Sequence, residues 1–218
     1  MNPFRILGDL SHLASILILT HTVQKTNVID GISFKTQVLY VLVFLTRYLD
    51  LLTFHWVSAY NSLMKIVFTA TSVYIVVLLQ RSKTMNPIAY KEMIMRDSFK
   101  IQYILGASFL LSLLFHHKFT FRETLWSFSV WLESFAILPQ LFMLSKSTKA
   151  ESLTVHYIFA LGLYRALYIP NWIWRYYAEG KIDGIALTAG IVQTLVYSDF
   201  FYIYYKKVVK RGGIGLPV

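Results

Sequence analysis

Residues 37–52, QVLYVLVFLTRYLDLL, decide how the rest of the chain is interpreted. Apolar residues fill most of the first two-thirds of this segment, and Arg47, Tyr48 and Asp50 then follow close together. Such a run is typical of a transmembrane helix, in which an ionisable side chain near the middle costs at least about 2.5 kcal/mol. Arg47 and Asp50 are three residues apart, so on a helix they share one face. They are either a structural ion pair or part of a site for a charged ligand, and the remaining sequence favours the site.

The composition indicates a polytopic membrane protein. Of the 218 residues, 56% are hydrophobic and 15% are charged, whereas soluble domains carry about 25% charged residues. The chain has no cysteine, which excludes disulfides and cysteine-ligated metals. No cleavable signal peptide is evident, so we expect the first helix to act as its own insertion signal. The net charge is +10. Its distribution along the chain indicates membrane orientation, so we expect no nucleic-acid partner.

Seven apolar stretches of spanning length predict one transmembrane domain of seven helices over residues 1–218. Several are shorter than the usual length of about 20 residues, which favours a thin membrane such as the endoplasmic reticulum or early Golgi. The stretches are residues 4–21, 35–52, 61–80, 100–115, 125–144, 153–172 and 185–208.

The distribution of lysine and arginine predicts the orientation of these helices. By the positive-inside rule the side richer in these residues is cytoplasmic, so the N-terminus is lumenal and residues 206–218 form a short cytoplasmic tail. The richer side holds Lys25, Lys35, Arg81, Lys83, Lys91, Arg96, Lys100, Lys146, Lys149, Lys206, Lys207, Lys210 and Arg211. The other side holds Arg5, Lys118, Arg122, Arg175 and Lys181, while Arg47, Lys65 and Arg165 lie within spans.

Seven helices can be divided into three, a linker helix, and three more. Each triplet has a similar polar segment before its second helix, GISFKTQ at residues 31–37 and AESLTVH at residues 150–156. Parallel repeats of this kind build small transporter folds of the SWEET, or PQ-loop, type. Pro139, followed by Gln140, is expected to kink the fifth helix, because proline leaves a carbonyl one turn back without its donor. We therefore predict an all-α, SWEET-like fold.

Polar side chains form stripes at helical spacing on three of the predicted helices. Lipid cannot satisfy such groups, so we expect them to face the bundle interior or a water-filled cavity. The aromatic members have an ordinary alternative explanation, because Trp and Tyr also gather at membrane interfaces. The stripes contain Arg5, Asp9 and His12 on the first helix, Glu123, Trp126 and Glu133 on the fifth, and Tyr164, Tyr168, Asn171, Trp172 and Arg175 on the sixth, with Arg165 beside them.

The charged residues of the predicted helices differ in their expected depth in the membrane. At about 1.5 Å per residue, Arg47 lies ~18 Å above the cytoplasmic start of its helix, and Arg5 and Arg175 lie at lumenal helix ends. We expect the three arginines to converge on one lumen-facing cavity rimmed by Asp50 and Glu123. Arginine presents a planar fork suited to carboxylates, and the acids suit a cationic group. A short acidic peptide tail fits such a cavity better than a neutral sugar.

The histidines support different interpretations. Histidine has an ordinary pKa of about 6.5, between pH 5 and 8, so His12 is either a neutral packing residue or a pH sensor. Its stripe with Arg5 and Asp9 favours the sensor. His116 and His117 are adjacent in a loop with no third ligand at zinc spacing, and we expect no metal site.

Catalysis finds little support in the sequence. No Ser-His-Asp order, glycine-rich phosphate loop or pair of carboxylates at catalytic spacing can be assembled. Glu133, Tyr164 and Arg165 have groups for proton chemistry, but no nucleophile accompanies them. We therefore predict no catalytic residues and no cofactor, and a binding site for a charged ligand is favoured over an intramembrane enzyme.

Five long motifs resemble the KDEL receptor family, and the resemblance covers the whole chain. Three residues make the chain resemble fungal members more than animal ones, namely His55, Trp56 and Pro170. The motifs are residues 1–12, 31–37, 46–50, 131–134 with 137–140, and 164–168 with 171–175.

The resemblance implies a seven-helix, SWEET-like receptor that retrieves escaped proteins of the endoplasmic reticulum from the Golgi. Its ligand is a C-terminal Lys- or His-Asp-Glu-Leu tail, bound tightly at acidic pH and released at neutral pH. Arg47 would hold the terminal carboxylate, and Arg5 and Arg175 the acidic side chains. The implied ligand-binding set is Arg5, Arg47, Tyr48, Asp50, Glu123, Trp126, Tyr164, Tyr168, Asn171, Trp172 and Arg175.

Further roles follow from the same resemblance. His12 would sense pH through a network of Glu133, Tyr164 and Arg165. Asp50 and Glu123 would face the first residue of the tail, with Trp126 and Trp172 packed against it. The cytoplasmic pair Lys206 and Lys207 would engage the retrograde vesicle coat.

Three features of the chain depart from the family pattern. Pro170 leaves the carbonyl of Ala166 without its usual donor. Residues 206–218 contain no Ser or Thr, so the tail has no phosphate acceptor, and its two lysines are adjacent rather than alternating.

A small-solute transporter is the alternative function, because the same helical repeat carries sugars and amino acids. A transporter opens its site to both faces of the membrane. The lumenal placement of the three arginines favours the receptor.

Overall fold

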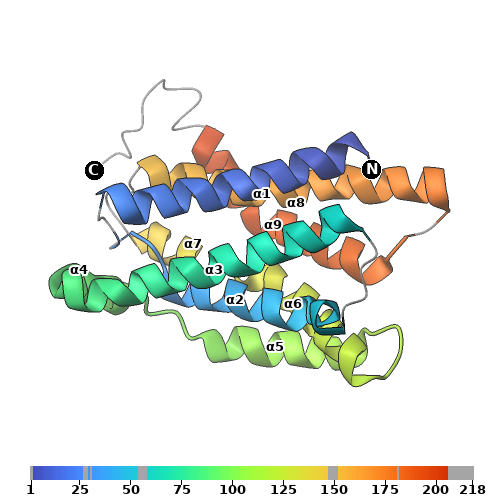
Figure 1. Ribbon diagram of the computed structural model, residues 1–218, viewed down its shortest axis with the longest axis horizontal. Helices are drawn as coiled ribbons and strands as arrows, with labels where there is room; N and C mark the ends of the chain where they lie inside the picture. The colour runs from blue at the N-terminus through green and yellow to red at the C-terminus, as the bar shows by residue number, and fades with distance from the viewer. Residues whose placement is uncertain are drawn as a thin grey trace.

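The computed structural model describes residues 2–26, 29, 31–53, 58–146, 152–180 and 182–205, and within these ranges the chain forms helices and no strand. The prediction of an all-α chain is confirmed. Lys206 and Lys207 lie outside the described residues. The elements (Figure 1) are α1 (Pro3–His21), η1 (Thr22–Thr26), α2 (Phe34–Arg47), η2 (Leu49–Thr53), α3 (Ala59–Met85), α4 (Pro87–Arg96), α5 (Ile101–Leu114), α6 (Phe121–Phe135), α7 (Leu138–Lys146), α8 (Ser152–Glu179) and α9 (Gly184–Tyr204).

Several of these helices are long and apolar enough to cross a membrane, so the chain is a helical membrane protein. The qualifying segments are Pro3–Lys25, Ala59–Met85, Phe121–Lys146 and Gly184–Tyr202, and Ile101–Leu114 is a shorter apolar helix. Helix α2 has 14 residues. Helix α8 has 28 residues, and the polar stripe interrupts its apolar sequence. The number of seven crossings stays a prediction.

Residues 37–52 do not form one continuous helix. Helix α2 ends at Arg47, because Tyr48 leaves the helical region with φ −102° and ψ 35°, and the short 3₁₀ helix η2 follows. The structure does not show the alternative in which Arg47 and Asp50 form a structural ion pair. With the helix ended between them, Arg47 bonds to Glu133 and Asp50 pairs with Lys65.

The predicted fifth helix is divided into α6 and α7, as Pro139 led us to expect. The two helices are separated by Ala136 and Ile137, because the ring of Pro139 conflicts with the carbonyl of Phe135 one turn earlier. Pro170 has a different outcome, since α8 continues through it.

The helices pack in pairs around an apolar core. Helices α1 and α8 run side by side along much of their length, α2 packs between α3 and α6, and α9 contacts α6 and α8 (Figure 1). Two glycines permit close approach of large rings. A Cβ atom on Gly8 of α1 would lie 2.8 Å from the ring of Tyr168, and one on Gly190 of α9 would lie 2.4 Å from the ring of Trp172. These glycines therefore set the positions of two predicted ligand-binding aromatics.

Basic residues gather at one end of the bundle, which we call the cationic end. The opposite end, where α1 begins and α2 finishes, we call the cavity end (Figure 1). The described lysines and arginines of the cationic end are Lys25, Lys35, Arg81, Lys83, Lys91, Arg96, Lys100 and Lys146, and those near the ends of helices at the cavity end are Arg5, Lys118, Arg122 and Arg175.

A polar cluster of Ser33, Lys35, Asp97 and Gln140, which we call the latch, joins segments at the cationic end. All of its members except the half-buried Lys35 are buried. The carboxylate of Asp97 accepts hydrogen bonds from the Ser33 hydroxyl (2.9 Å) and the Lys35 backbone N–H (2.8 Å). The Lys35 ammonium donates to the carbonyl of Phe99 (2.8 Å). These bonds attach the start of α2 to the connection between α4 and α5.

Gln140 completes the latch from α7. Its side-chain oxygen accepts from the Ser33 backbone N–H (2.8 Å), and its amide nitrogen donates to the Gly31 carbonyl (2.9 Å). The backbone N–H of Gln140 donates to the Thr36 hydroxyl (3.1 Å). The motif of residues 31–37 and the Pro-Gln motif, which lie far apart in the sequence, are therefore in direct contact.

Candidate functional site

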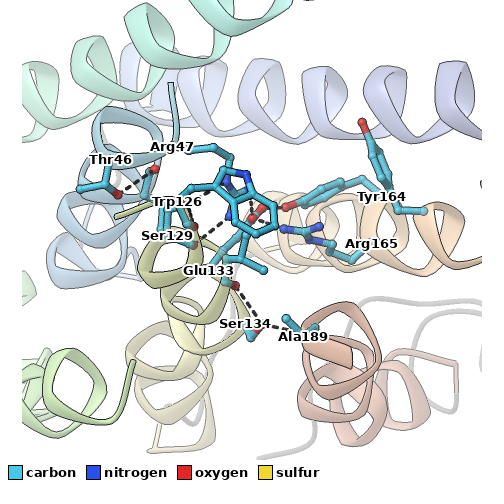
Figure 2. A network of polar contacts seen from close by, with 12 residues as sticks. Thr46, Arg47, Trp126, Ser129, Glu133, Ser134, Tyr164, Arg165 and Ala189 are labelled. Atoms are coloured by element: carbon cyan, nitrogen blue, oxygen red, sulfur yellow. Dashed lines mark hydrogen bonds and ion pairs between the residues drawn. The ribbon is translucent and has the colours of Figure 1, made fainter. Parts of the chain in front are cut away.

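A buried ionic cluster lies where α2, α6 and α8 meet. Glu133 of α6, 1% exposed, accepts hydrogen bonds from Arg47 of α2 and from both Tyr164 and Arg165 of α8 (Figure 2). Arg47 also donates from Nε to the Ser129 hydroxyl (3.1 Å) and from Nη2 to the Ser129 carbonyl (2.8 Å). The grouping of Glu133, Tyr164 and Arg165 is found in the structure, and Arg47 belongs to the same cluster.

The charges of this cluster do not balance. Two guanidinium groups share the single carboxylate of Glu133. Arg165 is 7% exposed, and its Nε lacks a hydrogen-bond partner among the described residues. A buried charge is costly unless an opposite charge compensates it. The cluster therefore leaves about one positive charge available to an anion that approaches Arg47.

A cavity of about 380 Å³ adjoins Arg47 at the cavity end of the bundle. This volume lies in the usual range for ligand sites, about 300–1,000 Å³. The cavity brings together five of the predicted ligand-binding residues, namely Arg47, Tyr48, Asp50, Glu123 and Trp126. Its other lining residues are Thr46, Leu49, Lys65, His117, Arg122 and Asp183.

Charged groups of both signs line this cavity. Lys65 of α3 pairs with Asp50, and its ammonium lies 5.6 Å from the centre of the Tyr48 ring. His117 lies 3.4 Å from a carboxylate oxygen of Asp183. A ligand with both anionic and cationic groups therefore finds partners on the cavity wall.

Three charged residues of the cavity wall, Lys65, Arg122 and Asp183, are not among the predicted ligand-binding residues. The available signal for Lys65 was its position within an apolar span, where an ionisable residue marks a functional site. Asp183 has no such signal in the sequence. In the structure it caps the start of α9 by accepting from the Ala186 N–H. Only the fold brings Asp183 close to His117.

Arg5 and Arg175 do not line the described cavity. Arg5 donates to Asn61 of α3. Arg175 projects from the end of α8, where its Nε lies 3.0 Å from Glu179, and its side chain is 46% exposed. The structure thus brings one of the three arginines to the cavity and leaves two at neighbouring positions on α1 and α8.

A second polar group joins α1 to α3 and α8. The carboxylate of Asp9 accepts from the hydroxyls of Tyr60 (2.7 Å) and Tyr168 (2.6 Å). Asn2 donates to the side chain of Asn171 (2.8 Å). Tyr168 and Asn171 therefore lie beside the first helix rather than on the cavity wall.

His12 connects the two polar groups through aromatic contacts. Its ring stacks on Phe68, with centroids 4.3 Å apart, and on Tyr164, 4.4 Å apart. Tyr164 in turn contacts Tyr168 edge to face at 6.1 Å, and Tyr168 contacts Trp172 at 5.9 Å. Because the Tyr164 hydroxyl bonds to Glu133, one side chain separates His12 from the Glu133 carboxylate.

Within the described ranges, no three histidines or acids gather into a group that would hold a metal ion. His117 instead contacts Asp183 and lies 5.8 Å from the ring of Trp126. The arrangement is suited to binding charged groups by ion pairs and hydrogen bonds.

Comparison with known proteins gives consistent matches. A family described as the ER lumen protein retaining receptor matches residues 28–175. The "ER lumen protein-retaining receptor" of Saccharomyces cerevisiae is 71% identical over 218 residues, covering 100% of both chains. The receptor of the same name from Kluyveromyces lactis is 62% identical over 213 residues, 98% of this chain and 97% of the relative. "ER lumen protein-retaining receptor 2" of Homo sapiens is 49% identical over 220 residues, covering 100% of both chains.

Proposed function

Because the chain belongs to the ER lumen protein retaining receptor family, we propose that it binds the C-terminal Lys- or His-Asp-Glu-Leu tails of escaped endoplasmic-reticulum proteins. The family consists of retention receptors, not enzymes, and the apolar helices make this member a multi-pass membrane protein. The tail would be captured in the Golgi and released in the endoplasmic reticulum.

The observation that carries this proposal is the unbalanced ionic cluster beside the cavity. Arg47 is the one member of the cluster that also lines the cavity. An anionic group arriving there supplies the charge that Glu133 alone does not. We assign the terminal carboxylate of the tail to Arg47, whose fork can hold both carboxylate oxygens.

The rest of the tail is assigned to groups around the cavity. Asp50 and Glu123 would bind a cationic first residue of the tail, with Trp126 and Trp172 packed against that residue. For Asp50 this requires the first residue to replace or share its ion pair with Lys65. The remaining assignments are Arg5 and Arg175 to the two acidic side chains, and Tyr48, Tyr164, Tyr168 and Asn171 to supporting contacts.

Titration of the purified receptor with Lys-Asp-Glu-Leu and His-Asp-Glu-Leu peptides between pH 5 and 7.5 tests this function. The same peptides with a C-terminal amide are the matched control, since they lack only the charge assigned to Arg47. We expect the amides to bind at least about 10-fold more weakly, which corresponds to one charge-assisted hydrogen bond. Equal binding of acid and amide would contradict the assignment of the carboxylate.

The pH dependence of binding is proposed to arise at His12. An added proton on His12 and an anionic tail attract each other, so each favours the binding of the other. Affinity should therefore rise as the pH falls, by at most about tenfold per pH unit for one coupled proton. Stacking of His12 on Tyr164, which bonds to Glu133, supports this coupling.

His12→Ala tests the sensor, with His117→Ala at the cavity wall as its matched histidine control. Peptide affinity is measured at several pH values in each protein. We expect a flattened pH profile for His12→Ala and an unchanged one for His117→Ala. If only His117→Ala flattens the profile, the sensor lies at the cavity opening. If neither does, Glu133 becomes the first candidate.

Retrieval to the endoplasmic reticulum is proposed to depend on Lys206 and Lys207, which follow the last described residue. Their replacement by alanine is expected to leave peptide affinity unchanged and to stop the return of the loaded receptor. The reason is that, in the orientation given by the positive-inside rule, this tail is cytoplasmic whereas the cavity faces the lumen. Alanine at Lys210 and Arg211 is the control, with receptor location followed by microscopy. Unimpaired return of the Lys206 and Lys207 variant would place the coat contact elsewhere.

We also propose seven crossings in a SWEET-like arrangement, with the N-terminus lumenal and the cationic end cytoplasmic. The gathering of basic residues at one end of the bundle supports this orientation through the positive-inside rule. The relatives that match are retention receptors, and the transporter alternative gains no support from them.

A further inference from the structure

A second cavity lies at the cationic end, on the opposite end of the bundle from the site described above. It has a volume of about 630 Å³ and lies between η1 and the last turns of α3. Its apolar wall comes from Val23, Tyr74, Leu78 and Met85. Its polar wall comes from Gln24, Lys25, Arg81, Ser82 and Asn86.

The cations of this cavity have no acidic counterpart in the wall. Lys25 and Arg81 are both exposed and both line the cavity. Among the residues that the structure describes, no aspartate or glutamate pairs with either of them. The lining residues also include neutral donors, the amides of Gln24 and Asn86. The charge and the donors together suit an anion that carries several oxygen atoms.

The backbone geometry of η1 contributes to this arrangement. Residues Thr22–Thr26 form a π-helical turn, a rare conformation that is frequent at functional sites. The turn carries both Gln24 and Lys25, and the amide of Gln24 hydrogen-bonds to the hydroxyl of Tyr74 on α3. The polar wall is therefore held against α3 by a direct side-chain contact.

The apolar wall continues along the outer face of α3. Tyr74, Leu78, Arg81 and Met85 follow the spacing of one helical face, and Tyr74 and Met85 are among the exposed large side chains. Helix α3 is apolar and long enough to span a membrane. An occupant with a charged head and a hydrocarbon tail would place its head against Lys25 and Arg81 and its tail along α3.

We propose that this cavity binds the headgroup of an anionic phospholipid. Basic pockets between transmembrane helices are a common form of lipid headgroup site. The proposal does not depend on tail binding at the cavity end. In the topology proposed above, the headgroup lies in the cytoplasmic leaflet, which is the one rich in anionic lipids.

The test is native mass spectrometry of the full chain in detergent, titrated with phosphatidic acid and, for comparison, phosphatidylcholine. We expect phosphatidic acid to bind preferentially. A Lys25→Ala/Arg81→Ala variant should bind phosphatidic acid about 30-fold more weakly, because each cation contributes about 1 kcal/mol. Lys25→Arg/Arg81→Lys, which keeps both charges, should retain most of it.

Lys83→Ala/Lys91→Ala is the matched control, because it removes two basic residues of the same end that do not line the cavity. An equal loss in this control, or equal binding of phosphatidylcholine, would overturn the proposal. Glycerol 3-phosphate, the same headgroup without acyl chains, separates a lipid from a soluble phosphate. If it displaces phosphatidic acid at equal concentration, the ligand is a soluble phosphate and the lipid proposal is wrong. Peptide affinity on the same preparations reports the tail site separately.

Discussion

Arg47→Ala is expected to weaken binding of a Lys-Asp-Glu-Leu or His-Asp-Glu-Leu peptide by at least about 100-fold, or about 3 kcal/mol. The guanidinium of Arg47 is the link between the cavity and the ionic cluster. Its removal leaves Glu133 satisfied by Tyr164 and Arg165, so the protein should fold. The cavity, however, loses the guanidinium assigned to the terminal carboxylate. Isothermal titration of the purified variant measures the loss.

Two further variants separate the geometry of Arg47 from its charge. Arg47→Lys should also bind poorly, because a point charge does not replace a planar fork that donates to Glu133, Ser129 and a ligand together. Arg122→Ala removes an exposed arginine from the wall of the same cavity and should change affinity less than about threefold. Similar losses in Arg47→Ala and Arg122→Ala would mean that general attraction, not a specific contact, holds the tail.

Glu133→Leu is expected to lower the free energy of unfolding by about 3–5 kcal/mol, because breaking a buried ion pair leaves its partner charge uncompensated. Here the loss of one carboxylate strands both Arg47 and Arg165. Glu133→Gln keeps hydrogen-bonding capacity and should be less destabilising than leucine. Thermal unfolding in detergent, with folded protein followed by size-exclusion chromatography, provides the measurement.

Glu179→Ala is the matched control for this experiment. Glu179 also accepts from an arginine, Arg175, but both side chains are about half exposed. An exposed pair of this kind contributes about 0.3–0.5 kcal/mol, so the midpoint of unfolding should change little. If Glu133→Leu unfolds at the temperature of Glu179→Ala, the ionic cluster does not stabilise the fold.

Much of the site could be predicted because charged side chains are rare in apolar helices. The expense of burying Arg47, Glu133 and Arg165 made them conspicuous, and the structure places all three in one cluster. The break before Pro139 was predictable for a similar reason, since proline acts on its own local backbone. A charge in an apolar helix and a proline within a helix can therefore both be recognised from the sequence.

Other features depend on where the helices finally pack. The end of α2 at Arg47 carries no proline or glycine signal, and the pairing of Asp50 with Lys65 joins α3 to the segment after α2. Depth alone placed Arg5 and Arg175 near the same level as Arg47, but depth does not say which way a side chain turns. The rotation of α1 and α8 about their axes, set partly by Gly8, is a property of the packed bundle.

The latch at the cationic end has a consequence for the route that a ligand takes. Ser33, Asp97 and Gln140 join three segments that a transporter would need to separate. These bonds hold the described segments of the cationic end together, so a peptide bound beside Arg47, as we propose, would leave through the entrance by which it came. Departure is then the reverse of arrival, and its timing is governed by the dissociation rate rather than by passage across the membrane. On this proposal, the receptor would move its cargo only by travelling with it.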